Sequence, residues 1–349
     1  MSKYIEVAGV GIGEGCPPFI IAEMSANHGG SLERAKKLVT AALEAGASAV
    51  KLQTYTADTI TLRSDNEEFR ISGGLWDGRT LYDLYEEAHT PWEWHKPLFE
   101  HARKIGITMF SSPFDNTAVD LLEDLNAPAY KIASFEAVDL PLIKYVASTG
   151  KPMIISTGMA DAEEIQEAID AAREGGCKEL AILHCVSGYP APAEDYNLKT
   201  IPDMIQRFGL VTGLSDHTLD NTTAIASVAL GASIIEKHFT LDRNGGGPDD
   251  SFSLEPADLA ALCRDSRGVW SALGRVDYGR KSSELSNVKF RRSLYFVKAL
   301  KAGELITDDA VRSVRPGYGM PPAKYDQVVG SKVSRDVEFG MPVTLDLIK

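Results

Sequence analysis

The segment FIIAEMSANH, residues 19–28, decides the fold. Its first five residues form an apolar run typical of a buried β-strand, and its last five introduce serine, asparagine and histidine. A doubly wound nucleotide-binding sheet would instead require a glycine-rich turn after the first strand. The segment therefore favours an α/β fold of the (β/α)8 TIM-barrel type, in which functional residues follow the carboxyl ends of the strands.

Along the rest of the chain, short apolar or β-branched runs recur, and most are followed by an amphipathic helical pattern. The predicted strands are residues 19–23, 49–53, 108–111, 129–132, 152–156, 181–184, 211–214 and 233–238. The clearest helical patterns are residues 31–45, 92–104, 162–174, 221–230 and 256–272, and Ser31 is the expected N-cap of the first. Eight strand–helix units within about 255 residues match the usual length of such a barrel.

The repeat leaves three segments outside it. Residues 56–91 are a long insertion between the second strand and its helix, and loops of that length at the mouth of a barrel usually serve function. The barrel domain is expected at residues 1–274, followed by a polar linker at 275–292. Residues 293–349 then alternate short strands with turn signals, which predicts a small, mostly β C-terminal domain.

The composition restricts the class of protein. With 44% hydrophobic and 24% charged residues the chain reads as a folded protein, and no apolar run approaches the ~20 residues needed to span a bilayer. The net charge of −13 argues against nucleic acid or anionic membranes as partners. No signal peptide is visible, and the four cysteines are scattered without metal-binding spacing. We therefore expect reduced thiols and a cytoplasmic protein.

The carboxyl ends of the predicted strands are uniformly polar. In chain order they carry Glu23, Lys51, Gln53, Ser111, Ser112, Lys131, Ser134, Ser156, Thr157, His184, Ser215, His217, Glu236 and His238. Any one of these could be an ordinary capping or surface residue. The complete ring, however, indicates an active site at the mouth of the barrel.

His217 and His238 end the seventh and eighth strands. Adjacent strands lie about 4.8 Å apart, so two imidazoles at neighbouring strand ends can converge on one cation. A two-histidine site would leave room for substrate oxygens and water. The pattern favours a metal site over two histidines that are hydrogen-bonded independently.

Lys51 and Lys131 point toward the mouth from the second and fourth strands, where a buried lysine needs a partner. One interpretation is a clamp for phosphate and carboxylate groups, completed by serine hydroxyls. The other is a Schiff-base nucleophile, as in barrel aldolases. The sequence leaves both open.

Two weaker signals have ordinary explanations. The GIGEG segment at residues 11–15 opens no helix, so it predicts a hairpin turn and not a nucleotide loop. Trp76, Tyr82 and Tyr85 of the insertion either line a sugar pocket or pack the insertion on the barrel.

The motifs IIAEMSANHGGS, AVKLQTYTADT, FSSPFD, YKIAS, STGM, LHC…YP, GLSDHT and IEKHFT resemble, in order, those of the sialic acid synthase family. The C-terminal RRSLY and VRPGYGM are similar to that family's antifreeze-like domain, a β-clip fold known as SAF. The insertion and the form AEMSANH resemble the pseudaminic acid branch of the family more than the branch that makes N-acetylneuraminic acid.

The resemblance implies a role for individual residues. His217 and His238 would bind a divalent metal such as Mn2+, Mg2+ or Co2+. Positions matching contacts to phosphoenolpyruvate are Lys51, Ser112, Lys131, Ser134, Ser156 and Ser215. Positions near the sugar or the reacting carbons are Glu23, Gln53, Tyr189 and Asp249. Arg315 would reach the site of a partner subunit in a domain-swapped homodimer, and Ser187 departs from the asparagine of the neuraminic acid enzymes.

The implied activity is that of a transferase, which joins phosphoenolpyruvate to an N-acetylated amino sugar. For the pseudaminic acid branch that sugar is 2,4-diacetamido-2,4,6-trideoxy-L-altrose, and Glu23 would manage a proton at the aldehyde oxygen or at water. The alternatives are an N-acetylneuraminate or legionaminate synthase with the same chemistry, a Schiff-base aldolase that uses Lys131, or a carbohydrate-binding protein without activity.

Overall fold

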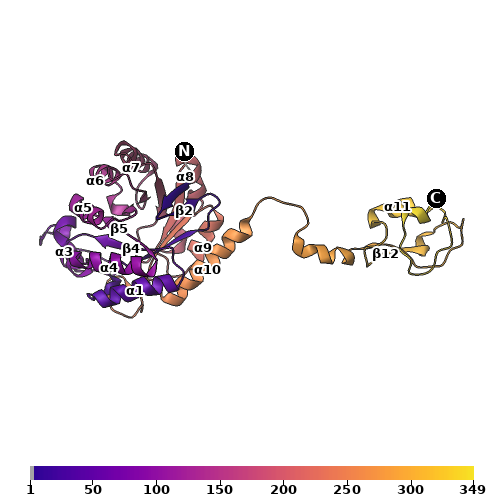
Figure 1. The fold of residues 1–349 in the computed structure, drawn as a ribbon, viewed down its shortest axis with the longest axis horizontal. Helices are drawn as coiled ribbons and strands as arrows, with labels where there is room; N and C mark the ends of the chain where they lie inside the picture. The colour runs from indigo at the N-terminus through magenta and orange to yellow at the C-terminus, as the bar shows by residue number, and fades with distance from the viewer. Residues whose placement is uncertain (1–3) are drawn as a thin grey trace. The chain divides into compact units, whose positions relative to one another are not determined.

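The structure, a computed structural model, describes residues 4–349. The chain divides into two compact units, with the boundary between Gly274 and Arg275 (Figure 1). The first unit holds the strands that the sequence places in a barrel. The second holds the C-terminal domain, and each unit is described by itself.

Eight parallel strands close into a barrel in the order β10-β3-β4-β5-β6-β7-β8-β9. They are β3 (Phe19–Glu23), β4 (Ala49–Thr54), β5 (Thr108–Pro113), β6 (Tyr130–Ile132), β7 (Met153–Ser156), β8 (Leu180–Cys185), β9 (Val211–Asp216) and β10 (Ile234–His238). Every strand begins and ends within two residues of its predicted bounds. The (β/α)8 barrel is confirmed.

Helices surround the barrel (Figure 1). They are α1 (Leu32–Glu44), α4 (Trp92–Ile105), α5 (Asn116–Asp124), α6 (Leu140–Ala147), α7 (Ala162–Glu174), α8 (Thr200–Phe208), α9 (Thr222–Ala229) and α10 (Pro256–Leu273). The Ser31 side chain accepts a hydrogen bond from the backbone N–H of Arg34, as expected of an N-cap. Helix α1 buries Ala35, Leu38, Val39 and Ala42, the spacing of one apolar face.

The amino end of the barrel is closed by an antiparallel hairpin, β1 (Tyr4–Val7) and β2 (Val10–Gly13). Its side chains Ile5, Val7 and Ile12 join the apolar cluster inside the barrel. The hairpin reverses at Ala8 and Gly9, both with positive φ, and not within residues 11–15 as predicted. That segment does contain a turn, at residues 14–15, which the Cys16 N–H closes by donating to the Gly13 carbonyl over 3.1 Å. Gly11 lies within β2 for another reason: a Cβ there would come within 2.5 Å of the Tyr4 hydroxyl oxygen.

The insertion after β4 has its own structure. It contains α2 (Ala57–Ile60), a 3-10 helix (Glu67–Phe69) and α3 (Leu81–Ala88). Tyr82 is buried and its hydroxyl donates to Asp58 over 3.2 Å, and the Tyr85 ring meets the Tyr55 ring edge-on at 5.7 Å. Tyr82 therefore packs within the insertion, and Tyr85 packs it against the residue that follows β4.

The C-terminal unit has a small apolar core that includes Leu294, Phe296 and Val343. Strands β11 (Ser293–Phe296) and β12 (Val311–Val314) pair antiparallel, and α11 (Tyr325–Val328) is its short helix. Part of the segment expected to be a polar linker forms a 3-10 helix, Ser282–Phe290. In the part of the chain that the structure describes, no helix is long and apolar enough to cross a membrane.

Candidate active site

Strand register brings the predicted site residues together at the carboxyl end of the barrel. His238 on β10 pairs with Glu23 on β3, and Glu23 pairs with Lys51 on β4. Glu236 lies beside Ser215 of β9 in the same way. Because neighbouring strands are about 4.8 Å apart, the register places a cation, two carboxylates and an imidazole within one small volume.

Four buried charged side chains form one ion-pair network in this volume. Lys51 Nζ lies 2.7 Å from Glu23 Oε2 and 3.8 Å from Glu236 Oε1, and Lys131 Nζ lies 2.7 Å from the same Glu236 oxygen. Burial lowers the pKa of Lys131 and raises that of Glu23. Burial also acts against charge on Lys51, but the carboxylates beside it outweigh burial and raise its pKa. The network holds two ammonium groups where an anion could bind.

Serine hydroxyls adjoin the lysines. Lys51 Nζ donates to Ser112 Oγ over 3.2 Å, and Ser215 Oγ donates to Glu236 over 3.5 Å. The Ser156 hydroxyl is buried without a hydrogen-bond partner, which is unusual unless a ligand supplies one.

Ser134 and Ser187 approach each other around the glycine of the STGM motif. A Cβ at Gly158 would lie 2.2 Å from Ser187 Oγ and 2.8 Å from Ser134 Oγ. Only glycine therefore allows both hydroxyls to come so close to the backbone. The position at which this sequence departs from the neuraminic acid enzymes thus lies beside Ser134, one of the predicted phosphoenolpyruvate contacts.

The two histidine rings lie 5.5 Å apart between centroids. His217 Nδ1 is 2.8 Å from the Val186 carbonyl oxygen, which can only accept a proton, so Nε2 keeps its lone pair. His238 Nδ1 is buried without a hydrogen-bond partner. Burial and the neighbouring His217 hold the pKa of His238 well below its usual value, so the ring stays neutral. Burial acts against charge on His217 as well, but the Cys185 side chain beside it outweighs burial and raises the pKa of that ring. A neutral His238 with an unpartnered nitrogen, beside a second imidazole, fits a cation.

The described residues contain no group of three or more histidine, cysteine or acidic side chains placed to hold a metal. The donor set therefore fits a cation with two protein ligands and open positions, as the sequence predicts.

A hydrogen-bonded chain joins the two carboxylates nearest the histidines. Gln53 Nε2 donates to Glu23 over 2.9 Å and to Ser25 Oγ over 3.1 Å, and Ser25 Oγ donates to Asp249 over 2.5 Å. Burial raises the pKa of Asp249 to about 6, although the Ser25 hydrogen bond opposes the shift. Asp249 Oδ2 is also 3.7 Å from His238 Nδ1.

Aromatic side chains from three loops stand beside the histidines. Tyr189 lies 4.4 Å from the His217 ring and 5.5 Å from the Phe252 ring, centroid to centroid. Trp76, from the insertion, lies 5.9 Å from Tyr189 and donates its Nε1–H to the Pro248 carbonyl over 3.1 Å. Of the three aromatic residues with an open role, only Trp76 reaches the site.

Sequence reasoning missed two members of this site. Ser25 has no role in the sequence analysis, although it lies two residues after the first strand; its backbone has φ of 43°, which is uncommon for a non-glycine residue. Glu236 was recognised only as a polar strand end, yet it is the shared partner of both lysines. Its IEKH context placed it at the mouth, but a partner on a distant strand cannot be read from spacing.

Some predicted residues lie elsewhere. His184 Nε2 meets the Tyr196 carbonyl oxygen, away from the lysine network. Arg315 is exposed at the end of β12, in the C-terminal unit. The four cysteines are free thiols, as expected.

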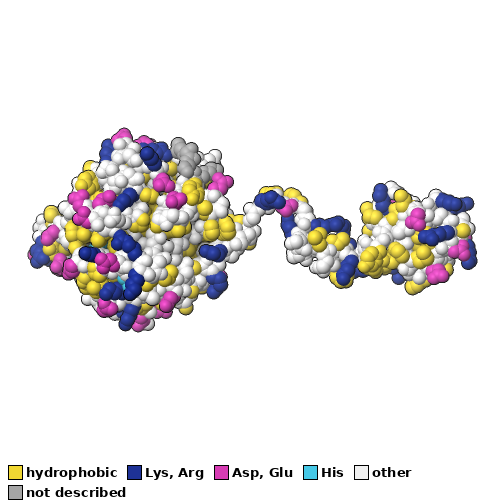
Figure 2. Space-filling view, viewed as in Figure 1, with side chains coloured by type: hydrophobic (Ala, Val, Ile, Leu, Met, Phe, Trp, Pro, Cys, Tyr) yellow, Lys and Arg dark blue, Asp and Glu magenta, His cyan; other side chains and the backbone are white. Residues whose placement is uncertain are grey.

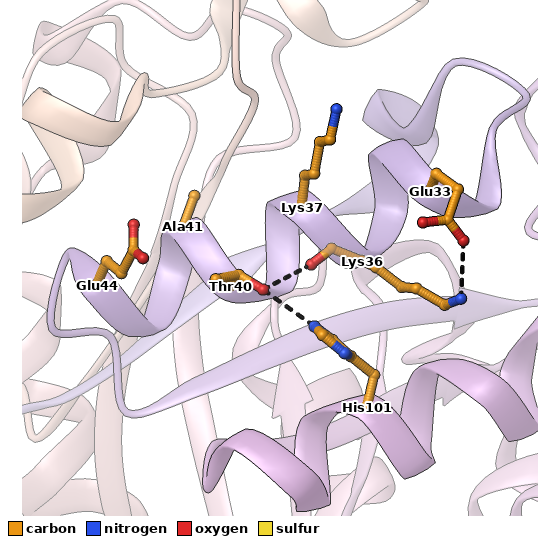
Figure 3. Close-up of a pocket in the computed structure, with 7 residues that line it drawn as sticks. All are labelled: Glu33, Lys36, Lys37, Thr40, Ala41, Glu44 and His101. Atoms are coloured by element: carbon orange, nitrogen blue, oxygen red, sulfur yellow. Dashed lines mark hydrogen bonds and ion pairs between the residues drawn. The ribbon is translucent and has the colours of Figure 1, made fainter.

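The structure also has a surface depression of about 540 Å³ that lies away from the strand ends, on helices α1 and α4 (Figure 3). It is lined by Glu33, Lys36, Lys37, Thr40, Ala41, Glu44 and His101. Two pairs of its polar groups contact each other: Lys36 pairs with Glu33 at 2.8 Å, and Thr40 Oγ1 lies 3.0 Å from His101 Nε2. None of the strand-end residues lines it, so the barrel mouth remains the candidate site.

Comparisons with known proteins agree with this geometry. The model of the NeuB family matches residues 38–278, and that of the SAF domain matches residues 291–349. Pseudaminic acid synthase of Campylobacter jejuni subsp. jejuni serotype O:23/36 is 46% identical over 322 residues, which cover 92% of this chain and 94% of the relative. Pseudaminic acid synthase of Helicobacter pylori is 42% identical, with coverage of 95% and 98%.

Among solved structures, the N-acetylneuraminic acid synthetase of Leptospira borgpetersenii serovar Hardjo-bovis, crystallised with citrate, superposes with a TM-score of 0.74 at 32% identity. The match covers 82% of this chain and 96% of that one. The two family models cover both units of the chain, and the relatives match more than nine-tenths of it. The chain belongs to the NeuB family, the sialic acid synthases.

Proposed function

We propose that this chain is a pseudaminic acid synthase. It condenses phosphoenolpyruvate with 2,4-diacetamido-2,4,6-trideoxy-L-altrose and water, and releases pseudaminic acid and phosphate. The observation that carries the proposal is the identity of 46% over 92% of the chain to a pseudaminic acid synthase. The buried lysines, carboxylates and histidines at the barrel mouth supply the groups that this reaction needs.

The lysine network is the binding site for phosphoenolpyruvate. Lys51 and Lys131 bind the phosphate and carboxylate groups, since both are buried lysines at the mouth and Lys51 also contacts the Ser112 hydroxyl. The remaining contacts come from Ser112, Ser134, Ser156 and Ser215. The unpartnered Ser156 hydroxyl is the most direct support for this assignment.

The sugar aldehyde lies between the histidines and the two carboxylates. C3 of phosphoenolpyruvate forms the new bond to C1 of the sugar, and the aldehyde oxygen takes a proton. The positive charge left at C2 is stabilised by the nearby carboxylates of Glu23 and Asp249. Water adds to C2, and the bond from C2 to the phosphate oxygen breaks. Glu23 transfers a proton at the aldehyde oxygen or at the water. Lys51 and Gln53 hold the Glu23 carboxylate in place.

A divalent cation, Mn2+, Mg2+ or Co2+, held by His217 and His238 would act as a Lewis acid toward the aldehyde oxygen. The chain itself contributes the two imidazoles and the fixed orientation of His217 through its bond to the Val186 carbonyl. Tyr189, packed on the His217 ring, limits where the sugar can enter.

The Schiff-base alternative has less support. Lys131 is engaged by Glu236 at 2.7 Å, and an ammonium in an ion pair is a poor nucleophile. Borohydride added with pyruvate should leave Lys131 and Lys51 unmodified in mass spectra. A reduced adduct on either lysine would favour the aldolase.

Phosphate release is the assay that tests the proposed function. We expect release to require phosphoenolpyruvate, the diacetamido sugar and a divalent metal, to stop with EDTA and to return with Mn2+. The neuraminate and legionaminate alternatives predict a preference for other N-acetylated sugars. Equal kcat/KM for N-acetylmannosamine and the diacetamido sugar would contradict the substrate assignment, and no release with any sugar would contradict the activity. The reaction is placed in the cytoplasm, where free thiols are stable.

We propose further that Arg315 completes the site of the partner subunit in a domain-swapped homodimer. Two features support it: apolar side chains in the loops after β6 and β7, Phe135, Val138 and Met159, are exposed, and so are Tyr318, Phe339 and Leu345 in the C-terminal unit. Figure 2 shows such apolar side chains in yellow on the C-terminal unit. Exposed patches of this kind mark interaction surfaces.

A mixed dimer tests the swap. Arg315→Ala and Glu23→Ala should each be nearly inactive as homodimers. In a heterodimer of the two variants, one site receives an intact arginine and an intact glutamate, so about half of the wild-type activity should return if the sites are independent. An arginine that serves its own barrel would leave both sites damaged. Absence of rescue in verified heterodimers would therefore refute the swap.

A further inference from the structure

The insertion after β4 carries a tight hairpin whose tip holds Trp76. Arg70 and Thr80 pair across the hairpin, and the Ile71 N–H donates to the Arg79 carbonyl over 2.8 Å. The Gly78 N–H donates back to the Ile71 carbonyl over 2.9 Å, which closes the tip. The turn is therefore held by backbone hydrogen bonds and presents a fixed set of side chains.

Trp76 differs from the rest of the tip. Within residues 72–78 of the described chain it is the one residue that is not exposed. Its indole N–H donates to the Pro248 carbonyl in the loop after β10, and its ring faces Tyr189 from the loop after β8. The tip of an insertion from one side of the barrel thus meets two loops that follow other strands.

Those two loops belong to the sugar side of the site. Tyr189 contacts the rings of His217 and His238 at 4.4 and 6.0 Å, and Asp249 follows Pro248 directly. With its aldehyde at the histidines, an open-chain hexose must extend its far carbons past Tyr189. Phosphoenolpyruvate fills the space at Lys51 and Lys131 in the proposed function, so the aromatic side chains are left for C4 to C6 of the sugar.

We propose that Trp76 is the residue that selects a 6-deoxy sugar, by packing its indole ring against the terminal methyl group at C6. This inference rests on the proposed function. An aromatic face is a large apolar surface with no acceptor for a hydroxyl, so it favours a methyl group over a hydroxymethyl group. The hydrogen bond to Pro248 holds the ring by its Nε1 edge, so it does not use the indole faces.

The test compares two sugars that differ only at C6: 2,4-diacetamido-2,4,6-trideoxy-L-altrose and its 6-hydroxy counterpart. Trp76→Ala should lower kcat/KM for the 6-deoxy sugar by about 10- to 100-fold, and change that for the 6-hydroxy sugar by less than about threefold. The loss should appear mainly in the KM for the sugar, with the KM for phosphoenolpyruvate unchanged.

Two variants serve as controls. Leu75→Ala removes the adjacent, exposed apolar side chain of the same tip and should leave both sugars unaffected. Trp76→Phe keeps an aromatic ring but lacks the N–H, so it should keep most of the preference. Equal losses on both sugars in Trp76→Ala would mean that the indole only anchors the hairpin, and no loss would mean that it does not meet the sugar. Either result overturns the inference.

A binding measurement removes the dependence on a stable Trp76 variant. Protein labelled with 5-fluorotryptophan should give four fluorine resonances, one for each tryptophan. Substituting Trp92, Trp94 and Trp270 singly assigns the fourth by elimination. The alditol of the 6-deoxy sugar, which has no aldehyde and cannot react, should shift the Trp76 resonance more than the 6-hydroxy alditol does. An unshifted Trp76 resonance at saturation overturns the inference. Wild-type enzyme that turns over no sugar would instead contradict the proposed function.

Discussion

The two ends of the same eight strands have opposite chemistry. At the amino end the barrel is filled by apolar side chains such as Phe19, Ile21 and Ile234, and the β1–β2 hairpin covers them. At the carboxyl end, only four residues along β3 from Phe19, the side chains are Glu23 and its charged neighbours. One strand therefore contributes to the core at its start and to the site at its end.

The difference shows where stability and function are separated in this fold. Apolar burial at the amino end contributes to the free energy of unfolding, about 25 cal/mol per Å² removed from water. The buried charges at the mouth bring a desolvation penalty that their ion pairs only partly offset. Substitutions at the mouth should therefore change kinetics, and substitutions at the amino end should change stability.

The largest effect is expected for the histidine pair. His217→Ala and His238→Ala should each lower kcat/KM by about 10³-fold or more, because a site with two protein ligands loses its cation when either is removed. The melting temperature should fall little. Metal content by mass spectrometry and phosphate release measure both effects. His184→Ala, also at a strand end but bonded to the Tyr196 carbonyl, is the matched control and should retain activity. Metal binding at wild-type affinity in either variant would exclude the two-histidine site.

Phe19→Ala tests the amino end. Phe19 is 2% exposed at the start of β3, so truncation leaves a cavity and should lower the free energy of unfolding by about 3 kcal/mol or more. Urea titration followed by circular dichroism measures it. At a temperature where the variant is fully folded, KM and kcat should match the wild type. A changed KM for phosphoenolpyruvate would show that the two ends are coupled.

Glu136 tests whether a polar group at the mouth costs stability. It ends the 3-10 helix after β6, and burial raises its pKa to about 7, with the Asp139 charge adding to the effect and Lys51 opposing it. The folded protein holds this proton more tightly than the unfolded chain, whose carboxyl titrates near 4.5. The contribution of this proton to the free energy of unfolding is therefore fully present below about pH 4.5, and it is lost as pH rises through about 7.

The variant Glu136→Gln removes this titration. It should be more stable than wild type by about 2 kcal/mol at pH 8, and the advantage should disappear near pH 4. Urea unfolding at both pH values measures the difference. A stability difference that does not change with pH would mean that the Glu136 carboxyl is solvated in the folded state.

The same contrast explains what the sequence could predict. The strands are predicted to within two residues, because most begin with an apolar or β-branched run and polar residues lie at or just after its end. The mouth was found because those polar ends are periodic in the chain. Lys51 and Lys131 were placed together at the mouth for the same reason.

What the sequence could not supply depends on contacts between distant strands. Glu236 pairs with Lys131 across 105 positions, and no local pattern identifies that partner. The turn of the first hairpin was misplaced because Gly11 is required by the approach of Tyr4, not by the turn. Ser25 belongs to the candidate site through its hydrogen bond to Asp249, 224 residues away.

The smallest effect is expected at Ser31, which lies at the mouth end of the barrel without belonging to the site. Its hydroxyl caps α1 by accepting from the Arg34 N–H over 3.3 Å, so Ser31→Ala should lower the free energy of unfolding by about 1 kcal/mol. Ser31→Asp, which restores a capping acceptor, should recover most of that loss. Steady-state kinetics should be unchanged in both, because no strand-end side chain depends on this bond. A change of more than a few fold in KM for either substrate in Ser31→Ala would contradict this. Residues at the helix starts would then also affect substrate binding, and the separation between a stabilising amino end and a functional carboxyl end would be less sharp than the strands suggest.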